Sequence, residues 1–292
     1  MEVQFRVGPR PARVDERPGL PALLPPPPSV HPPAHHPPPF RVSSPQRHEK
    51  ESSAIDRRES MAPPGGHVLW LHGSGQTGEE SRAQVAPYFS SPELASVRLS
   101  FPTAPTAPIP CYGGEVITAW FSIPEVPITA KTARDEKEVL KAVERVHEML
   151  DREVAAGTSP SNIFVCGLSQ GGALAIASVL LYPKTLGGCV VFSGSLPLSK
   201  SFAEKVPSEA RKTPVLWFHG MADGVVLFEA GHAGCAFLQE IGMHCEFKVA
   251  YPTLGHTLVD EELQYFRRWI KDRLSQGTGV PVPSLSDKMD LQ

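Results

Sequence analysis

The sequence predicts an α/β fold in which a mostly parallel central sheet is covered by helices on both faces. Short apolar runs alternate along the chain with stretches of helical periodicity, which is the pattern of parallel strands joined by right-handed helical crossovers. The runs are apolar at consecutive positions, as strands buried on both faces require. Such a sheet carries its functional loops at the carboxyl ends of the strands.

Composition divides the chain into one domain and two tails. Fourteen of its 32 prolines fall between Pro9 and Pro45, a density that prevents a helix or a sheet core from forming. We expect a Pro-rich disordered segment at 1–62, a folded domain at 63–275 and a flexible tail at 276–292.

Two further hypotheses concern the N-terminal segment. Met61 stands directly before the first expected strand, which suggests that the functional product begins at this residue. The run Pro25 to Pro28 has the form of a ligand for an SH3 or WW domain, although an unconstrained linker is the simpler interpretation.

Six strands and five helices are expected inside the domain. The expected strands are His67–Leu71, Val97–Phe101, Ile163–Cys166, Gly188–Phe192, Val215–Phe218 and Cys245–Ala250. The clearest helix is expected at Thr132–Ala156, where apolar residues recur every three or four positions and Thr132 with Asp135 has the form of a capping box. The other helices are expected at Glu79–Phe89, Ala173–Tyr182, Phe228–Ile241 and Leu258–Leu274.

Charge, cysteine content and hydropathy exclude several classes of protein. A net charge of −3 and a pI near 6.4 provide no basic surface for nucleic acid or anionic lipid. The five cysteines lack metal-ligand spacing and lie mostly in apolar runs, so we expect packed free thiols, a cytoplasmic location and no structural metal. The most apolar stretch, Phe164–Pro183, is interrupted by Gln170 and by glycines and serines, so we expect no stable membrane insertion.

Gly167, Ser169 and Gly171 have the spacing of a nucleophile elbow between an expected strand and an expected helix. In such a turn the serine backbone is strained, and the positions two before and two after it must be small because strand and helix nearly touch. The bare pattern is weak, since an ordinary turn serine can match it by chance. The strand before it and the helix after it make the nucleophile the stronger interpretation.

A serine nucleophile needs a base and a group that orients the base, expected in the order Ser, Asp, His in this class of fold. Asp223 follows the expected strand Val215–Phe218, and His256 follows the expected strand Cys245–Ala250. Both therefore lie where the active edge of the sheet should be. We predict that Ser169, Asp223 and His256 form a catalytic triad.

Other residues compete for these roles. Asp260, Glu261 or Glu262 could orient the imidazole base, but we interpret all three as the solvated first turn of the last helix. His72 and His219 also follow strands. Because both precede the position that the Ser, Asp, His order requires, we expect packing or hydrogen-bonding roles for them.

A Gly-rich loop, Leu71–Gly78, follows the first expected strand, and its glycines let backbone N–H groups approach a ligand oxygen. We predict an oxyanion hole made by the N–H groups of Ser74 in this loop and of Gln170, next to the nucleophile. A Gly-rich turn without function is the alternative. A P-loop is excluded because no Gly-Lys-Ser/Thr follows.

Together, these residues resemble the acyl-protein thioesterase and carboxylesterase family of α/β-hydrolases, and most closely its plant branch of SOBER-like carboxylesterases. The similarity covers Gly66–Leu274, nearly all of the chain outside the tails. It rests on the motifs Leu71–Gly78, Phe101–Pro105, Ala119–Phe121, Gly167–Leu174, Leu180–Thr185, His219–Asp223 and Gly255–His256.

The resemblance implies an α/β-hydrolase fold and hydrolysis of acyl thioesters or carboxylic esters without a cofactor. It implies the same triad and oxyanion hole. It also implies that the segment Pro105–Ala130, which shows no periodicity, forms a lid beside an acyl groove. Trp120 and Phe121 in this lid would then bind substrate.

Three positions depart from the family pattern. Ser74 stands where a leucine is usual, and Gln76 and Ser122 stand where aspartates are usual. A backbone N–H donor survives the first change, but the apolar wall for an acyl chain is weakened and two carboxylates are missing near the lid. The chemistry is therefore retained, whereas chain-length preference and efficiency are left open.

The predicted function is that of a serine hydrolase that deacylates S-acylated proteins or short acyl esters through an acyl-enzyme intermediate. The expected partner is the acylated protein or small acyl ester itself, without nucleic acid, and a weak dimer is compatible with the sequence. Two alternatives stay open. One is a lysophospholipase, because the same triad cleaves a glycerol ester, and the other is a hydrolase-fold ligand receptor that has largely lost turnover.

Overall fold

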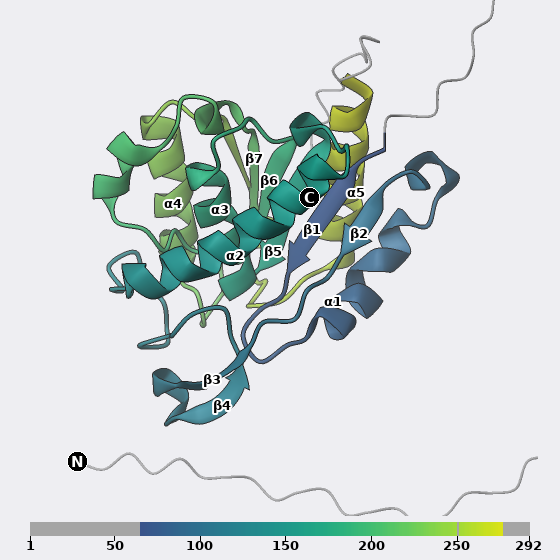
Figure 1. Cartoon of the computed structure of the whole chain (residues 1–292). Coiled ribbons are helices and arrows are strands. Elements are labelled where there is room, and N and C mark those ends of the chain that lie inside the picture. The colour runs from purple at the N-terminus through teal and green to yellow at the C-terminus, as the bar shows by residue number, and fades with distance from the viewer. Residues whose placement is uncertain (1–64, 250, 277–292) are drawn as a thin grey trace, which may run out of the picture. The chain divides into compact units, whose positions relative to one another are not determined.

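Six parallel strands form the central sheet, in the order β2-β1-β5-β6-β7-β8 (Figure 1). Every strand expected from the sequence is present. Neighbouring strands run parallel, as the predicted helical crossovers require. The strands are β1 (His67–Leu71), β2 (Arg98–Ser100), β5 (Ile163–Leu168), β6 (Gly188–Phe192), β7 (Val215–Phe218) and β8 (Cys245–Lys248).

The computed structural model describes residues 65–249 and 251–276. Three sequence-based predictions lie outside this range. They are the Pro-rich segment 1–62 with its run Pro25 to Pro28, the proposed start at Met61, and all of the tail 276–292 except its first residue.

Helices cover both faces of the sheet, as predicted. Successive strand residues point to opposite faces, so Leu69 and Leu71 join one apolar cluster while Val68 and Trp70 join the other. The first cluster contains α2, α3 and α4, and the second contains α1 and α5; Figure 1 shows α2 crossing one face and α5 behind the sheet. The helices are α1 (Gly78–Val85), α2 (Glu136–Ala155), α3 (Gln170–Leu181), α4 (Phe228–Glu240) and α5 (Asp260–Gln276).

The start of α2 differs from the predicted one. The sequence indicated a helix from Thr132 with a Thr132/Asp135 capping box, but α2 begins at Glu136. Asp135 is the N-cap, and its carboxylate accepts hydrogen bonds from the amides of Lys137 and Glu138. Thr132 instead accepts from the Thr129 amide, so the predicted capping box is wrong although Asp135 does cap the helix.

The predicted lid contains regular structure that its sequence did not indicate. Within Pro105–Ala130, β3 (Thr106–Ile109) and β4 (Glu115–Thr118) form an antiparallel hairpin. Figure 1 shows the hairpin beyond the end of the sheet toward which the β1 arrow points. Each strand has only four residues and β3 contains a proline, so no alternating pattern long enough to signal a strand is present.

Short 3₁₀ turns complete the described structure. They lie at Ala86–Phe89, Pro92–Leu94, Pro110–Tyr112, Pro160–Asn162, Lys200–Lys205 and Ala210–Lys212. The described residues include no helix whose length and hydropathy would let it cross a bilayer. All five cysteines are free thiols, and four of them are buried as predicted.

The first turn of α5 is less solvated than its sequence suggested. Asp260 and Glu261 are exposed, but Glu262 is only 3% exposed, so the predicted solvated position is wrong for this residue. Its carboxylate accepts a long hydrogen bond, 3.4 Å, from the Val259 amide. Burial raises the pKa of Glu262 to about 7, and the Val259 amide only partly opposes this effect.

The substitution Glu262→Gln should make stability less dependent on pH. The pKa of Glu262 is about 7 in the folded chain and 4.5 when unperturbed, so the unfolded chain loses this proton first as the pH rises. The wild type should therefore lose up to about 3 kcal/mol of unfolding free energy between about pH 4.5 and about pH 7, and the variant should not. Urea denaturation on either side of this window measures the difference, with Glu204→Gln, at an exposed position that does not affect the pKa of Glu262, as control. Equal pH dependence of wild type and Glu262→Gln would contradict the prediction.

Candidate active site

Ser169 occupies the sharp turn between β5 and α3, at the carboxyl end of β5. Its φ of 56° and ψ of −119° lie outside the regions that residues with a side chain ordinarily adopt. The strained turn is held by a hydrogen bond of 2.8 Å from the Ser169 amide to the carbonyl of Phe192 in β6. This is the backbone geometry of a nucleophile elbow, which lifts the serine side chain clear of the sheet.

The two glycines around Ser169 are required by contacts with backbone. A Cβ atom on Gly171 would lie 2.0 Å from the carbonyl oxygen of Leu71 at the end of β1. A Cβ atom on Gly167 would lie 2.4 Å from the carbonyl carbon of Gly171. The elbow therefore touches the next strand directly, and neither position has space for a side chain.

Asp223 and His256 come from the loops after β7 and β8 and meet at the same edge of the sheet. His256 Nδ1–H donates to Asp223 Oδ2 at 2.7 Å. Asp223 Oδ1 accepts from the amides of Val225 and Val226, each at 2.9 Å. Burial by itself would raise the pKa of Asp223, but the hydrogen bonds from His256 and the two amides lower it below its usual value.

In the described structure, the Ser169 hydroxyl is not hydrogen-bonded to the His256–Asp223 pair. Among the hydrogen bonds of residues 65–249 and 251–276, none joins the Ser169 hydroxyl to His256. Catalytic hydrogen bonds of this kind are often long or misaligned in a site without substrate and tighten when substrate binds. The structure thus joins Asp223 to His256 and places Ser169 at the same strand edge.

Two buried histidines support the loops of the site, in the hydrogen-bonding roles that the sequence predicted for them. His72 Nδ1–H donates to the Gly73 carbonyl at 2.7 Å, and its Nε2 accepts from the Ala104 amide at 2.9 Å. His219 Nε2–H donates to the Val226 carbonyl at 2.8 Å and lies 3.4 Å from the Asp223 carboxylate. Burial lowers the pKa of both imidazoles, so both are neutral supports.

The loop after β1 presents its backbone to the cavity beside Ser169. Ser74 lines this cavity together with Ser169 and Gln170. Gln170 is the first residue of α3, where a backbone N–H has no partner within the helix. Within the described part of the chain, the amides of Ser74 and Gln170 make no other hydrogen bond, so both are available to a ligand oxygen.

Two of the positions that depart from the family pattern, Gln76 and Ser122, form hydrogen bonds with neighbouring residues. The Gln76 side-chain carbonyl accepts from the Gly73 amide at 3.0 Å and closes the loop that carries Ser74. The Ser122 amide donates to the Glu138 carboxylate at 2.8 Å, so α2 supplies a carboxylate beside the lid.

The side chain of Gln170 has a role that sequence reasoning missed. Its amide donates to the Phe121 carbonyl at 2.6 Å, and its carbonyl accepts from the Trp120 amide at 2.9 Å. The Trp120 indole donates in turn to the His72 carbonyl at 2.8 Å. These bonds attach the lid to the elbow and to the loop after β1, and no local pattern could have signalled contacts so distant in sequence.

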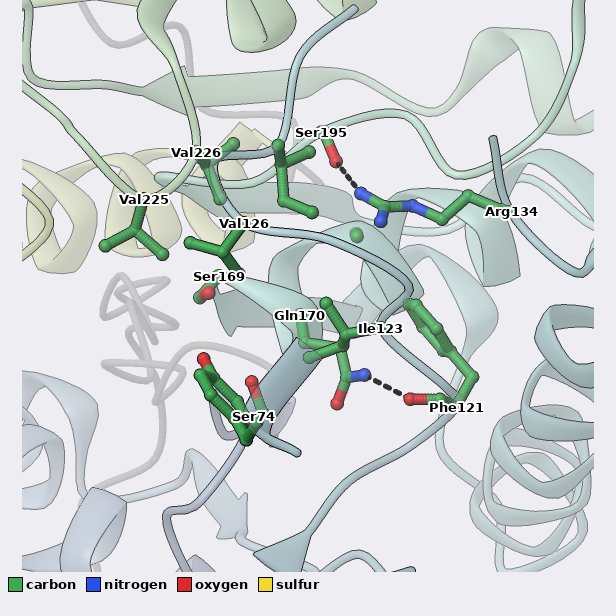
Figure 2. Close-up of a pocket in the computed structure, with 13 residues that line it drawn as sticks. Ser74, Phe121, Ile123, Val126, Arg134, Ser169, Gln170, Ser195, Val225 and Val226 are labelled. Atoms are coloured by element: carbon green, nitrogen blue, oxygen red, sulfur yellow. Dashed lines mark hydrogen bonds between the residues drawn. The ribbon is translucent and has the colours of Figure 1, made fainter. Parts of the chain in front are cut away.

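The two aromatic residues predicted to bind substrate lie in different places. Phe121 lines the cavity that contains Ser169, as Figure 2 shows. Trp120 is buried and borders a second depression, which Phe121 also lines, together with Pro105 and Glu138. Contact with an acyl group stays a prediction for both residues, and Trp120 also connects its segment to the loop after β1.

The cavity at Ser169 is small. About 30 Å³ of it is open to the centre of a water molecule, within an indentation of about 390 Å³ that includes open solvent. It opens to solvent beside Tyr112 and Val126, which are 42% and 39% exposed. Its walls are mostly apolar, with Arg134 among them (Figure 2).

Comparison with known proteins defines the class to which this fold and site belong. Residues 57–274 match the phospholipase/carboxylesterase family model. The chain belongs to this family, and its parallel sheet with helices on both faces is the α/β-hydrolase fold. The resemblance predicted from the motifs is thereby confirmed, and with it the class of enzyme, a hydrolase.

Relatives that are 48% to 92% identical come from plants, as the resemblance to the plant branch predicted. A probable carboxylesterase of Oryza sativa subsp. japonica is 92% identical over 234 residues, covering 80% of this chain and 99% of the relative. The crystal structure of Arabidopsis thaliana carboxylesterase SOBER1 is similar with a TM-score of 0.69 and 50% identity, covering 72% of this chain and 99% of that one. The crystal structure of Zea mays acyl-protein thioesterase 2 has a TM-score of 0.63 and 27% identity, with coverages of 73% and 96%.

The substitution Gly171→Ala should disrupt the elbow. Its Cβ atom would lie 2.0 Å from the Leu71 carbonyl oxygen, which cannot retreat because β1 is held in the sheet on both sides. We expect a loss of about 3 kcal/mol in unfolding free energy, measured by urea denaturation. Gly224→Ala is the matched control, because a Cβ atom there meets nothing within 4 Å. Equal stability of the two variants would show that the close approach is not obligatory.

Proposed function

We propose that Ser169 is the nucleophile, His256 the general base and Asp223 the residue that orients the base, in a serine hydrolase of esters or thioesters. The observation that carries this proposal is the 2.7 Å hydrogen bond between His256 Nδ1 and Asp223 Oδ2, at the strand edge that also holds the strained Ser169. With its proton on Nδ1, the imidazole has Nε2 free to accept the serine proton.

The reaction proceeds through an acyl-enzyme. The Ser169 oxygen attacks the acyl carbonyl carbon while its proton passes to His256 Nε2. The tetrahedral intermediate collapses, the bond to the leaving alcohol or thiol breaks, and His256 returns the proton to it. Water then attacks the acyl-enzyme while His256 takes its proton; the bond between Ser169 Oγ and the acyl carbon breaks, His256 returns the proton to Ser169, and the carboxylic acid leaves. Asp223 stays ionised throughout, consistent with its lowered pKa.

The amides of Ser74 and Gln170 are proposed to stabilise the oxyanion. Both residues line the cavity at Ser169, and the Gln170 amide also belongs to the positive end of the α3 dipole. Donors held in place before reaction stabilise the developing charge without reorganisation. Replacing a leucine by Ser74 leaves this backbone donor in place.

A short acyl group is the proposed substrate moiety. The enclosed part of the cavity is small, since only about 30 Å³ is open to the centre of a water molecule within an indentation of about 390 Å³ that includes open solvent. It therefore suits the first few atoms of an acyl chain, and a palmitoyl chain would extend beyond it. Small acyl esters and proteins carrying short acyl groups fit this space. The lysophospholipase alternative requires a long chain at the same place and is less well supported.

A reducing compartment, with the cytoplasm as the specific proposal, fits the cysteine content. All five cysteines are free, and burial raises the pKa of the Cys166 thiol well above its usual value. Such thiols are unreactive packing groups and do not need an oxidising environment.

The substitution Ser169→Ala should lower kcat for p-nitrophenyl acetate by about 10⁶, because no other group can form the acyl-enzyme. His256→Ala should have an effect of similar size. Ser201→Ala, at an exposed serine remote from the cavity, should leave kcat unchanged. Retention of more than about 1% of wild-type turnover by Ser169→Ala would refute the assignment. A wild type without any turnover would favour the receptor alternative.

The acyl chain-length profile should decline from short to long chains. We expect kcat/KM for p-nitrophenyl acetate or butyrate to exceed that for the palmitate by at least about tenfold. Methylenes that do not fit into the pocket contribute no binding energy to the transition state. A palmitoyl-peptide thioester measured alongside tests whether the enzyme removes a long acyl chain from a peptide. A maximum at palmitate would show that the cavity opens far beyond the observed volume.

A further inference from the structure

A cationic side chain forms part of the wall of the cavity at Ser169. The other walls are supplied mainly by apolar side chains, among them Phe121, Ile123 and Val226. Figure 2 shows the Arg134 guanidinium at one side of the cavity, where it donates a hydrogen bond to Ser195. A charge in an otherwise apolar acyl cavity is unexpected, because a neutral acyl chain offers it no partner.

Arg134 lacks the partners that usually accompany a half-buried arginine. Its Nη2 donates to Ser195 Oγ at 3.1 Å, and its Nε is buried without a hydrogen-bond partner. Across the described ranges, no carboxylate lies within 4.0 Å of its guanidinium. Glu125 attracts it electrostatically from farther away and is itself exposed to solvent.

The Arg134 guanidinium therefore keeps hydrogen-bond donors that a ligand in the cavity can use. Arginine stays charged at neutral pH even when burial lowers its pKa, as it does for Arg134. The Nε atom is closed to solvent, so an incoming carboxylate would bind through the Nη groups of the guanidinium, with which it forms strong charge-assisted hydrogen bonds. Ser195 is only 5% exposed and uses its oxygen to accept from Arg134, so its own hydroxyl proton is free to donate.

We propose that this cavity binds the terminal carboxylate of a short dicarboxylic acyl group, of about three or four carbons, with Arg134 and Ser195 as specificity-determining residues. The inference rests on the proposed function, because the other end of the acyl group must be held at Ser169. Both Ser169 and Arg134 line the same cavity, so one short acyl group reaches from the reacting carbonyl to the guanidinium.

The dimensions of the cavity agree with this substrate class. The cavity is an indentation of about 390 Å³ including open solvent, bordered by the exposed Tyr112 and Val126, which suits a short polar chain whose end is partly solvated. A long apolar chain would have to bury the guanidinium against methylenes, which leaves the charge unpaired. Arg134 therefore selects against such chains as well as for a carboxylate.

The test compares monoethyl succinate with ethyl 4-methylpentanoate, a neutral ester of matching shape, by measuring ethanol release. In the wild type we expect kcat/KM for the succinate ester to equal or exceed that for the neutral ester. Arg134→Met should lower this ratio by about 10- to 100-fold, the range expected for hydrogen bonds to a charged group. Arg134→Lys, which keeps the charge but not the paired donors, should fall between the two.

Lys131→Met is the matched control, because it removes a positive charge from an exposed position on the same segment and should leave the ratio unchanged. An unchanged ratio in Arg134→Met would overturn the inference, as would a wild type that prefers the neutral ester. The second result does not depend on whether a variant folds. No turnover of either ester or of p-nitrophenyl acetate by the wild type would overturn the proposed function as well, whereas turnover with an unaffected ratio would overturn only the role of Arg134.

Discussion

The site depends on one backbone contact, between the turn that carries Ser169 and the end of β1. Gly171 meets the Leu71 carbonyl so closely that a Cβ atom would stand 2.0 Å from it. Because no side chain intervenes, α3 begins directly beside the loop that contains Ser74. Serine hydroxyl, helix N-terminus and Gly-rich loop therefore share one cavity. The strained Ser169 backbone persists because the sheet on one side and α3 on the other leave it no alternative.

Buried hydrogen bonds, together with apolar packing, then determine where each loop of the site lies. His72, Trp120 and Gln170 connect the loop after β1, the lid and the elbow. His219 and Asp223 do the same for the loop after β7, through the amides and carbonyl of the turn that follows. An unpaired polar group in a protein interior costs more than it does in water. Each of these hydrogen bonds therefore favours the arrangement in which it forms, and only the Nδ1 atom of His219 lacks a partner among the described atoms of this network.

Different parts of the chain supply the proposed reactive groups of the cavity and the groups that select the substrate. Reactivity is proposed to reside in groups at the ends of strands, which the sheet holds rigidly. Phe121, Val126 and Arg134, by contrast, belong to the segment between β4 and α2, which lies outside the central sheet and packs against it through loop residues. Such a segment can change its side chains without disturbing the elbow. The fold thus permits one catalytic arrangement to serve different acyl groups. Arg134 is a residue of the cavity wall through which the acyl group can be selected.

Much of the fold and of the candidate site could be read from local pattern. Strands β1, β6 and β7 have the predicted bounds, and the elbow, with Asp223 and His256 after later strands, follows from periodicity and turn sterics that act over a few residues. The hairpin β3–β4, the burial of Glu262 and the position of Arg134 in the cavity were decided by the tertiary structure alone. Each depends on which distant segments cover a residue, and a local sequence pattern carries no information about its neighbours in space.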